Sequence, residues 1–222
     1  MFFKRNRLDY LGDMHKDQFI KILKRFIRSP KSCLDIENGI LKELIHTWNN
    51  LNYSAHDEYL TSCIYNSLKH SGSPILECGS GLTTILVGII AGQKGHTLWS
   101  LENSEIWGER VRYILKTFRI YSVHLNIKPL KDYGGYYWYD PPLDSMPDKF
   151  GLVICDGPPG NTIGGRYGLI PVMRTRLSKG TLILLDDASR PDEQNIAERW
   201  RQELNAIAEI AGIRKPFYKI IL

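Results

Sequence analysis

From residue 74 onward, short apolar runs alternate with helical patterns, and this alternation restricts the chain to a narrow class of folds. The predicted strands are residues 74–79, 96–103, 122–130, 150–157 and 180–187. The predicted helices between and after them are residues 83–92, 105–118, 168–177 and 191–200. Alternating strands and helices indicate a parallel sheet covered by helices on both faces. We therefore predict an α/β fold with a doubly wound, Rossmann-like sheet of about seven strands.

The two ends of the chain depart from this alternation. Residues 204–222 have the pattern of two strands joined by a Gly and Pro turn, so the last strand is predicted to be antiparallel. Residues 14–28 place Phe19, Ile20, Leu23, Phe26 and Ile27 on one stripe of a basic helix. Such a helix packs on its own domain, or it binds a membrane surface or a partner. A second helix is predicted within residues 36–51, and a third is predicted to begin at Ser54. We expect an N-terminal helical extension, 1–53, and a Rossmann-like domain, 54–222.

Charge and hydrophobicity limit the classes of function. The longest apolar runs are too short to span a bilayer, and no apolar stretch follows the basic N-terminus as in a signal peptide, so we expect a cytoplasmic protein. Residues 1–28 hold eight Lys or Arg and three Asp, which accounts for the whole net charge of +5. A nucleic-acid partner is disfavoured because the rest of the chain is neutral. The sequence does not indicate an oligomeric state.

The first predicted strand leads into a glycine-rich turn, Gly79-Ser80-Gly81, and an unexpected acid, Glu77, stands two residues before it. In a doubly wound fold such a turn lets the backbone approach a ligand. The third glycine of the dinucleotide pattern is missing, and no lysine follows to make a phosphate loop. Glu77, which we expect at the lip of the site, would repel a diphosphate by about 1 to 4 kcal/mol at contact range. A cationic ammonium or sulfonium group would be attracted.

A second acid follows the second predicted strand. Glu102 stands where doubly wound folds present a carboxylate to the two hydroxyls of a ribose. Together with Glu77, it favours a nucleoside that carries a cationic tail. A nicotinamide-dependent dehydrogenase shares the fold and the second acid, and is kept as an alternative.

The motifs LECGSG and VICDGPP, with Glu102 and Asp132 between them, resemble those of the class I S-adenosylmethionine-dependent methyltransferases. The resemblance covers roughly residues 54–222. It implies S-adenosylmethionine as cofactor, with the first acid and the glycines near the methionine part, Glu102 on the ribose and Asp132 near the adenine. The cofactor-binding residues that we expect are Glu77, Gly79, Ser80, Gly81, Thr83, Glu102, Asp132 and Asp156.

Three aspartates end the last two predicted parallel strands. Asp156, Asp186 and Asp187 meet at one rim if those strands are neighbours, and they then repel one another unless a cation joins them. Here the sequence is similar to the catechol and caffeoyl-coenzyme A O-methyltransferases, a branch that holds Mg²⁺ or another divalent metal ion with an Asp and an Asp-Asn pair. Asp187 stands where Asn is usual, so a metal-bound and a metal-free site both remain open. Asp156 and Asp187 are also the expected catalytic residues, with Asp187 as general base in the metal-free case.

Two further segments are candidates for the acceptor side. Residues 132–142 are crowded with aromatic rings, which either line a cleft for a planar substrate or form a packed hairpin. The glycine-rich residues 160–168 suggest a mobile lid, on which Arg166 either pairs with an anionic substrate group or is solvated.

The sequence thus predicts a methyltransferase whose acceptor is a hydroxyl group of a small molecule. The DGPP stretch lacks the Asn-Pro-Pro-Tyr pattern that resembles amino-group methyltransferases of bases, which favours oxygen as the acceptor. Three alternatives remain: a nucleic-acid methyltransferase that uses the basic arm, the dehydrogenase, and a binding module without turnover.

Overall fold

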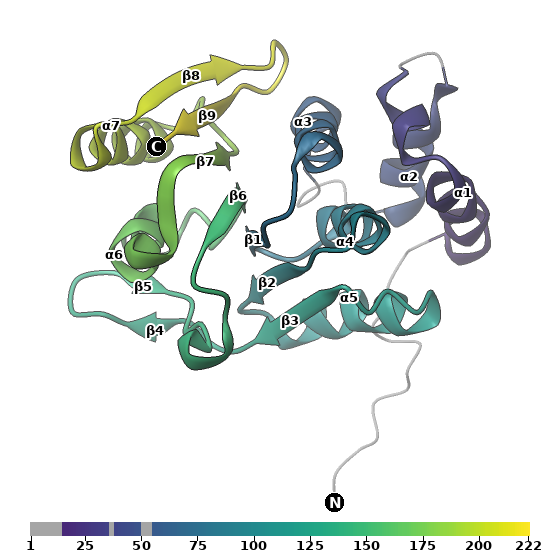
Figure 1. Ribbon diagram of the computed structural model, residues 1–222, viewed down its shortest axis with the longest axis horizontal. Coiled ribbons are helices and arrows are strands. Elements are labelled where there is room, and N and C mark those ends of the chain that lie inside the picture. Colours follow the sequence, from purple (N-terminus) through teal and green to yellow (C-terminus); the bar gives the residue numbers. More distant parts are fainter. Residues whose placement is uncertain (1–14, 36–37, 50–54) are drawn as a thin grey trace, which may run out of the picture.

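The computed structural model describes residues 15–35, 38–49 and 55–222, and Figure 1 shows their arrangement. Within these residues, a seven-stranded sheet forms the centre. Its strands are β1 (Ile75–Cys78), β2 (Leu98–Glu102), β3 (Val123–Ile127), β6 (Phe150–Cys155), β7 (Leu177–Leu185), β8 (Ile207–Ala211) and β9 (Phe217–Ile221). Two short strands, β4 (Lys131–Asp132) and β5 (Tyr137–Trp138), form a separate hairpin.

The strand order is β3-β2-β1-β6-β7-β9-β8. The first five strands are parallel, and β9 runs antiparallel to both β7 and β8. This confirms the predicted doubly wound sheet of about seven strands with an antiparallel last strand. The chain order reverses between β1 and β6, and the carboxyl ends beside such a switch point are where this class of fold binds ligands.

Helices cover both faces of the sheet. They are α1 (Lys16–Arg28), α2 (Ile40–Trp48), α3 (Asp57–Lys69), α4 (Leu82–Lys94), α5 (Glu105–Thr117), α6 (Leu169–Met173) and α7 (Pro191–Leu204). In Figure 1, α3, α4 and α5 lie on one face, whereas α6, α7 and the β4–β5 hairpin lie on the other. Helix α4 is apolar nearly all round, so it is buried from Leu82 to Ala91. Its Gly88 leaves room for the Val123 side chain of β3.

The N-terminal helices belong to the same core. Phe19, Leu23 and Phe26 of α1 are buried in one cluster with apolar residues of α2, α3 and α4. Ile22 is buried on this stripe, while the predicted Ile20 and Ile27 are only half-buried. The basic helix therefore packs on its own domain, as one of the two interpretations held. The domain boundary at residue 54 stays a prediction.

Two expectations near the N-terminus need comment. Helix α3 begins at Asp57 rather than at Ser54, which lies outside the described residues. Residues 1–14, the first half of the basic arm (residues 1–28), also lie outside the described residues. Across the part of the chain that the structure describes, no helix combines the length and the hydrophobicity that a membrane span requires.

We predict that the α1 packing contributes strongly to stability. Phe26→Ala removes a ring with no exposed surface, so the free energy of unfolding should fall by roughly 3 to 5 kcal/mol. Lys24→Ala, on the exposed face of the same helix, should change it by less than about 0.5 kcal/mol. Urea unfolding followed by far-UV circular dichroism measures both, and equal effects would contradict the shared core.

Candidate functional site

A cavity of about 610 Å³ opens at the carboxyl ends of the parallel strands. Loops after β1, β2, β6 and β7 line it, together with the loop that precedes β9. The lining residues are Gly79, Ser80, Glu102, Asn103, Ser104, Ile106, Trp107, Tyr139, Asp156, Gly157, Pro159, Gly160, Arg166, Asp187, Arg190 and Lys215. The cavity thus occupies the place where the fold presents its ligand site.

The turns after β1 and β6 touch each other, and glycine is required in both. Gly79 has a φ of +93°, and a Cβ atom there would lie 3.1 Å from the Gly157 amide nitrogen. A Cβ on Gly157 would collide with the Tyr139 hydroxyl and lie 3.1 Å from Gly79 Cα. The two turns therefore form one surface whose backbone is open to a ligand.

Glu102, the last residue of β2, holds the glycine turn in place. One carboxylate oxygen accepts hydrogen bonds from the Ser80 amide at 3.0 Å and the Ser80 hydroxyl at 2.7 Å. The other accepts from the Ser104 amide at 2.7 Å. The Trp107 indole also donates to the Ser80 carbonyl. Glu102 lines the cavity and fixes the loops after β1 and β2 against each other.

Glu77 does not lie at the lip of the site, which corrects the expectation from the sequence. It is fully buried beneath α4, where one carboxyl oxygen accepts hydrogen bonds from Thr84 at 2.6 Å and Ser100 at 2.5 Å. Among the described residues, its other oxygen has no partner. Burial raises the pKa of Glu77 to about 8, so the carboxyl is largely neutral at pH 7.

Three other predicted cofactor residues also lie outside the cavity lining. Gly81 precedes the first residue of α4 and donates its amide to Thr84, and Thr83 is buried in that helix. Asp132 is exposed on β4 and accepts a hydrogen bond from the Gly134 amide. The structure therefore brings Gly79, Ser80, Glu102 and Asp156 to the cavity, and places Asp132 away from it.

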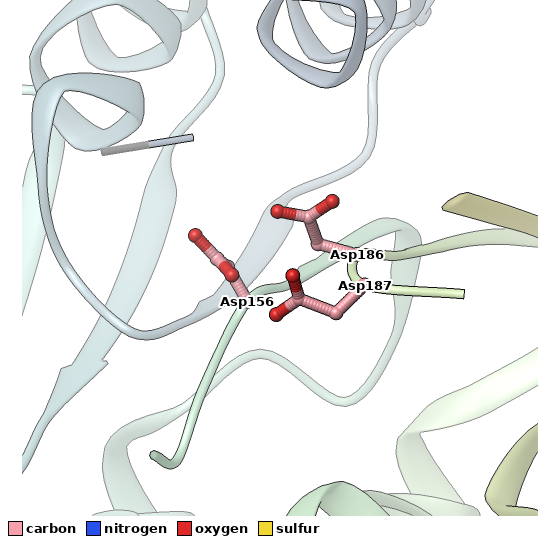
Figure 2. A group of neighbouring side chains, drawn as sticks. All are labelled: Asp156, Asp186 and Asp187. Atoms are coloured by element: carbon pink, nitrogen blue, oxygen red, sulfur yellow. The ribbon is translucent and has the colours of Figure 1, made fainter. Parts of the chain in front are cut away.

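The three aspartates converge as predicted, because β6 and β7 are parallel neighbours in register. One carboxylate oxygen from each lies within 4.8 Å of the others. Figure 2 shows Asp156 on the loop after β6 and Asp186 and Asp187 at the end of β7, with their side chains gathered around one space. Asp187 has a φ of +63°, a left-handed conformation that aspartate tolerates better than most residues.

Arg166 is not solvated, contrary to one expectation, and its guanidinium is already paired with carboxylates of the chain itself. It stands in a short 3₁₀ turn (Gly165–Gly168), is 2% exposed, and contacts Asp156 at 3.1 Å and Asp187 at 2.8 Å. It also donates to the main-chain carbonyls of Asp156 and Asp186. Buried Glu193 of α7 lies 3.8 Å from it. The segment predicted as a mobile lid is thus anchored by a buried guanidinium.

Two more basic side chains complete the cluster. Lys215 lies 3.2 Å from Asp186 and 3.0 Å from Asp187, and Arg190 lies 3.0 Å from Asp187. The chain's own cations therefore join the three carboxylates. A divalent ion would have to displace Lys215 and share ligands with Arg166, so the residues present do not fit a metal site of the kind that the resemblance implied.

The environments of two aspartates differ in a way that matters for proton transfer. Burial and the charge of Asp186 raise the pKa of Asp156 to about 7, although Arg166 opposes them. Burial alone would raise the pKa of Asp187, but Arg166 and Lys215 outweigh it and hold that pKa below its usual value. Asp156 also keeps 25% of its side chain exposed. It is the better candidate for a base.

Several cavity residues were missed by sequence reasoning. Ser104 caps α5 by accepting from the Trp107 amide, a pattern that sequence alone can reveal. Tyr139 belongs to the aromatic segment already singled out. Arg190 and Lys215 stand in no recognisable motif, and only the fold brings them to the aspartates.

The aromatic segment is a packed hairpin, as one of the two interpretations predicted, and the role in a planar-substrate cleft stays a prediction. It forms the β4–β5 hairpin, with Trp138 and Tyr139 buried, and Tyr136 lines a second cavity of about 550 Å³. Tyr167 and α7 form other walls of that cavity, where Arg199 stacks on the Tyr167 ring at 3.6 Å. Both cavities include Gly160, so they adjoin at the loop after β6.

The buried acid of β1 predicts a pH dependence of stability. Since the pKa of Glu77 in the folded state, about 8, exceeds its usual 4.5, the folded protein holds an extra proton between these values. Stability from this group is full below about pH 4.5 and is lost as the pH rises toward about 8. In the wild type this group should make the free energy of unfolding roughly 2 to 4 kcal/mol lower at pH 8 than at pH 5, and in Glu77→Gln that difference should disappear. Urea unfolding at the two pH values measures it. Glu209→Gln, on exposed β8, should behave as wild type, and an unchanged profile in Glu77→Gln would show that Glu77 is ionised.

No protein-family model and no curated protein matches this sequence. Solved structures match in three dimensions. An O-methyltransferase from Bacillus cereus in complex with S-adenosylhomocysteine (SAH) is 18% identical, with a TM-score of 0.57 over 82% of this chain and 90% of its own. An SAH-bound methyltransferase from Podospora anserina is 13% identical, with a TM-score of 0.60 over 93% and 96%. Precorrin-6y C5,15-methyltransferase from Geobacter metallireducens is 19% identical, with a TM-score of 0.56 over 76% and 89%. The chain therefore has the Rossmann-like fold of S-adenosylmethionine-dependent methyltransferases.

Proposed function

We propose that this chain is an S-adenosylmethionine-dependent methyltransferase that acts on a hydroxyl group of a small molecule. One observation carries the proposal: a single cavity is lined by the glycine turn, by Glu102 and by Asp156. The glycine turn and Glu102 suit a nucleoside, and Asp156 suits the role of proton acceptor. Two solved structures with this fold are bound to SAH, which supports this class of cofactor.

The residues at the glycine turn fit the nucleoside cofactor. Gly79 and Ser80 present backbone to the cavity, and Glu102 accepts three hydrogen bonds. A carboxylate offers about four acceptor sites, so Glu102 retains capacity for a ribose hydroxyl. Trp107 and Ile106 supply apolar surface beside it. When bound, S-adenosylmethionine supplies a methyl group on a sulfonium that needs no further activation.

The remaining task of the protein is to position an acceptor and remove its proton. We assign the proton to the Asp156 carboxylate, which lines the cavity and is partly exposed. Asp187 was the other expected catalytic residue. Its contacts with Arg166, Arg190 and Lys215 suit a positioning role instead. The acceptor's oxygen would form its new bond to the methyl carbon as the carbon–sulfur bond breaks, the sulfur would leave as the neutral thioether of SAH, and the O–H proton would pass to Asp156.

Cofactor binding is the first test. Isothermal titration with SAH should show one binding site. Glu102→Gln should raise the Kd for SAH tenfold or more, because the anionic acceptor for Ser80 and a ribose is lost. Ten-fold corresponds to about 1.4 kcal/mol. Glu105→Gln, exposed on α5, is the matched control and should bind as wild type. NADH should give no heat. Absence of SAH binding at millimolar concentration, or binding of NADH at the glycine turn, would sink the proposal.

The base assignment is tested by pH. A screen of phenols, catechols and polyols for SAH release identifies a working acceptor. With it, kcat/KM should rise as the pH increases to about 7 and then level off, since only the Asp156 carboxylate accepts a proton. Asp156→Asn should lower kcat by about 10² to 10⁴ and leave SAH affinity within a few-fold of wild type. A full-activity Asn variant would exclude this base.

A further inference from the structure

The three-aspartate cluster shows an unusual distribution of positive charge. Arg166 contacts Asp156 and Asp187, and Lys215 contacts Asp186 and Asp187. Arg190 also contacts Asp187, so three positively charged side chains face the three carboxylates. They lie where oxygen ligands from three carboxylates converge within 4.8 Å.

Asp186 depends on Lys215 more than its neighbours do. Its side chain has no exposed surface, and Lys215 at 3.2 Å is the cation that contacts it. Among the described residues, its other carboxylate oxygen has no hydrogen-bond partner although it is buried. A buried carboxylate with one oxygen unpartnered and one on an ammonium is a strong ligand for any cation that replaces the lysine.

Lys215 is held in this position by a dedicated set of contacts. The Glu58 carboxylate, at the start of α3, accepts hydrogen bonds from the amides of Ile213, Arg214 and Lys215. The Arg214 side chain pairs with Asp57 in the same helical turn. The loop between β8 and β9 is therefore fixed to α3 both through its backbone amides and through the Arg214 side chain. Burial opposes the charge, but Asp186 and Asp187 outweigh it and raise the pKa of Lys215 above its usual value.

We propose that Lys215 is the resident cation of the three-aspartate cluster, and that it occupies the space in which a divalent cation would otherwise bind. The wild-type site is thereby closed to Mg²⁺ and Mn²⁺. Removal of the ammonium uncovers a site for one such ion, with Asp186 and its two neighbours as the oxygen ligands.

The position of Lys215 also bears on the acceptor, a step that rests on the proposed methyl transfer. An ammonium has three N–H groups, and two are directed at Asp186 and Asp187. Lys215 lines the same cavity as Asp156, so the third is available to an acceptor oxygen. It would stabilise the negative charge that develops as Asp156 takes the proton, the role that a metal ion fills elsewhere.

Binding of Mn²⁺, followed by the loss of the free-ion signal in electron paramagnetic resonance, tests the proposal without turnover. Wild type should bind no Mn²⁺ up to about 1 mM. Lys215→Ala should bind one ion at least tenfold more tightly than wild type, and Lys215→Arg, which keeps the charge, should not. Lys128→Ala is the matched control, because it breaks another 3.2 Å lysine–aspartate pair at an exposed position. It should resemble wild type.

The double variant Lys215→Ala/Asp186→Asn locates the new site, since it should lose the gained Mn²⁺ binding. If Lys215→Ala does not fold, Lys215→Met keeps the aliphatic stem and takes its place. Stoichiometric Mn²⁺ binding by wild type, or a folded Lys215→Ala or Lys215→Met that binds no better, overturns the proposal. SAH titration of the same samples separates this outcome from a failure of the proposed function, because the Mn²⁺ result does not depend on it.

Discussion

The architecture of the site depends on a guanidinium removed from water. Arg166 is almost fully buried, yet it contacts Asp156, Asp187 and the neighbourhood of Glu193, and it ties the main chain after β6 to that after β7. Acids packed this closely are stable only when a cation compensates them. The rigid fork of Arg166 does so for oxygens of both loops at once. Arg166 consequently anchors the loop 160–168 to the ends of β6 and β7.

The fold could be predicted because its signals are local. The alternation of apolar runs with amphipathic stretches, the glycine turn and the acids after successive strands all appear in short windows of sequence. Strand neighbours then followed from the general behaviour of doubly wound sheets. The start of α3 was placed three residues too early. The two acids of its first turn, Asp57 and Glu58, also bind the loop that precedes β9.

Half of the predicted cofactor-binding residues line the cavity. For the acids, the position of each one along its strand explains whether it reaches the cavity. Glu102 is the last residue of β2, and Asp156 follows the last residue of β6, so both reach the rim. Glu77 is inside β1, where its side chain faces Ser100 and α4. In the sheet register Glu77 is opposite Ser100 and Ile154, so Glu102 and Asp156 each lie two positions farther along their strands. Arg166 and Lys215 were assigned wrongly or missed because their partners are 10 to 29 residues away in the chain.

The bonds from Glu58 to the β8–β9 loop have a consequence for genetics. A carboxylate on the outer end of α3 sets the position of a lysine at the cavity, so damage at this helix would be transmitted to the rim through a few hydrogen bonds. Variants selected for lost activity should therefore include substitutions at Glu58 that leave the protein well expressed. A map of such variants would place affected positions at the start of α3 as well as around the cavity.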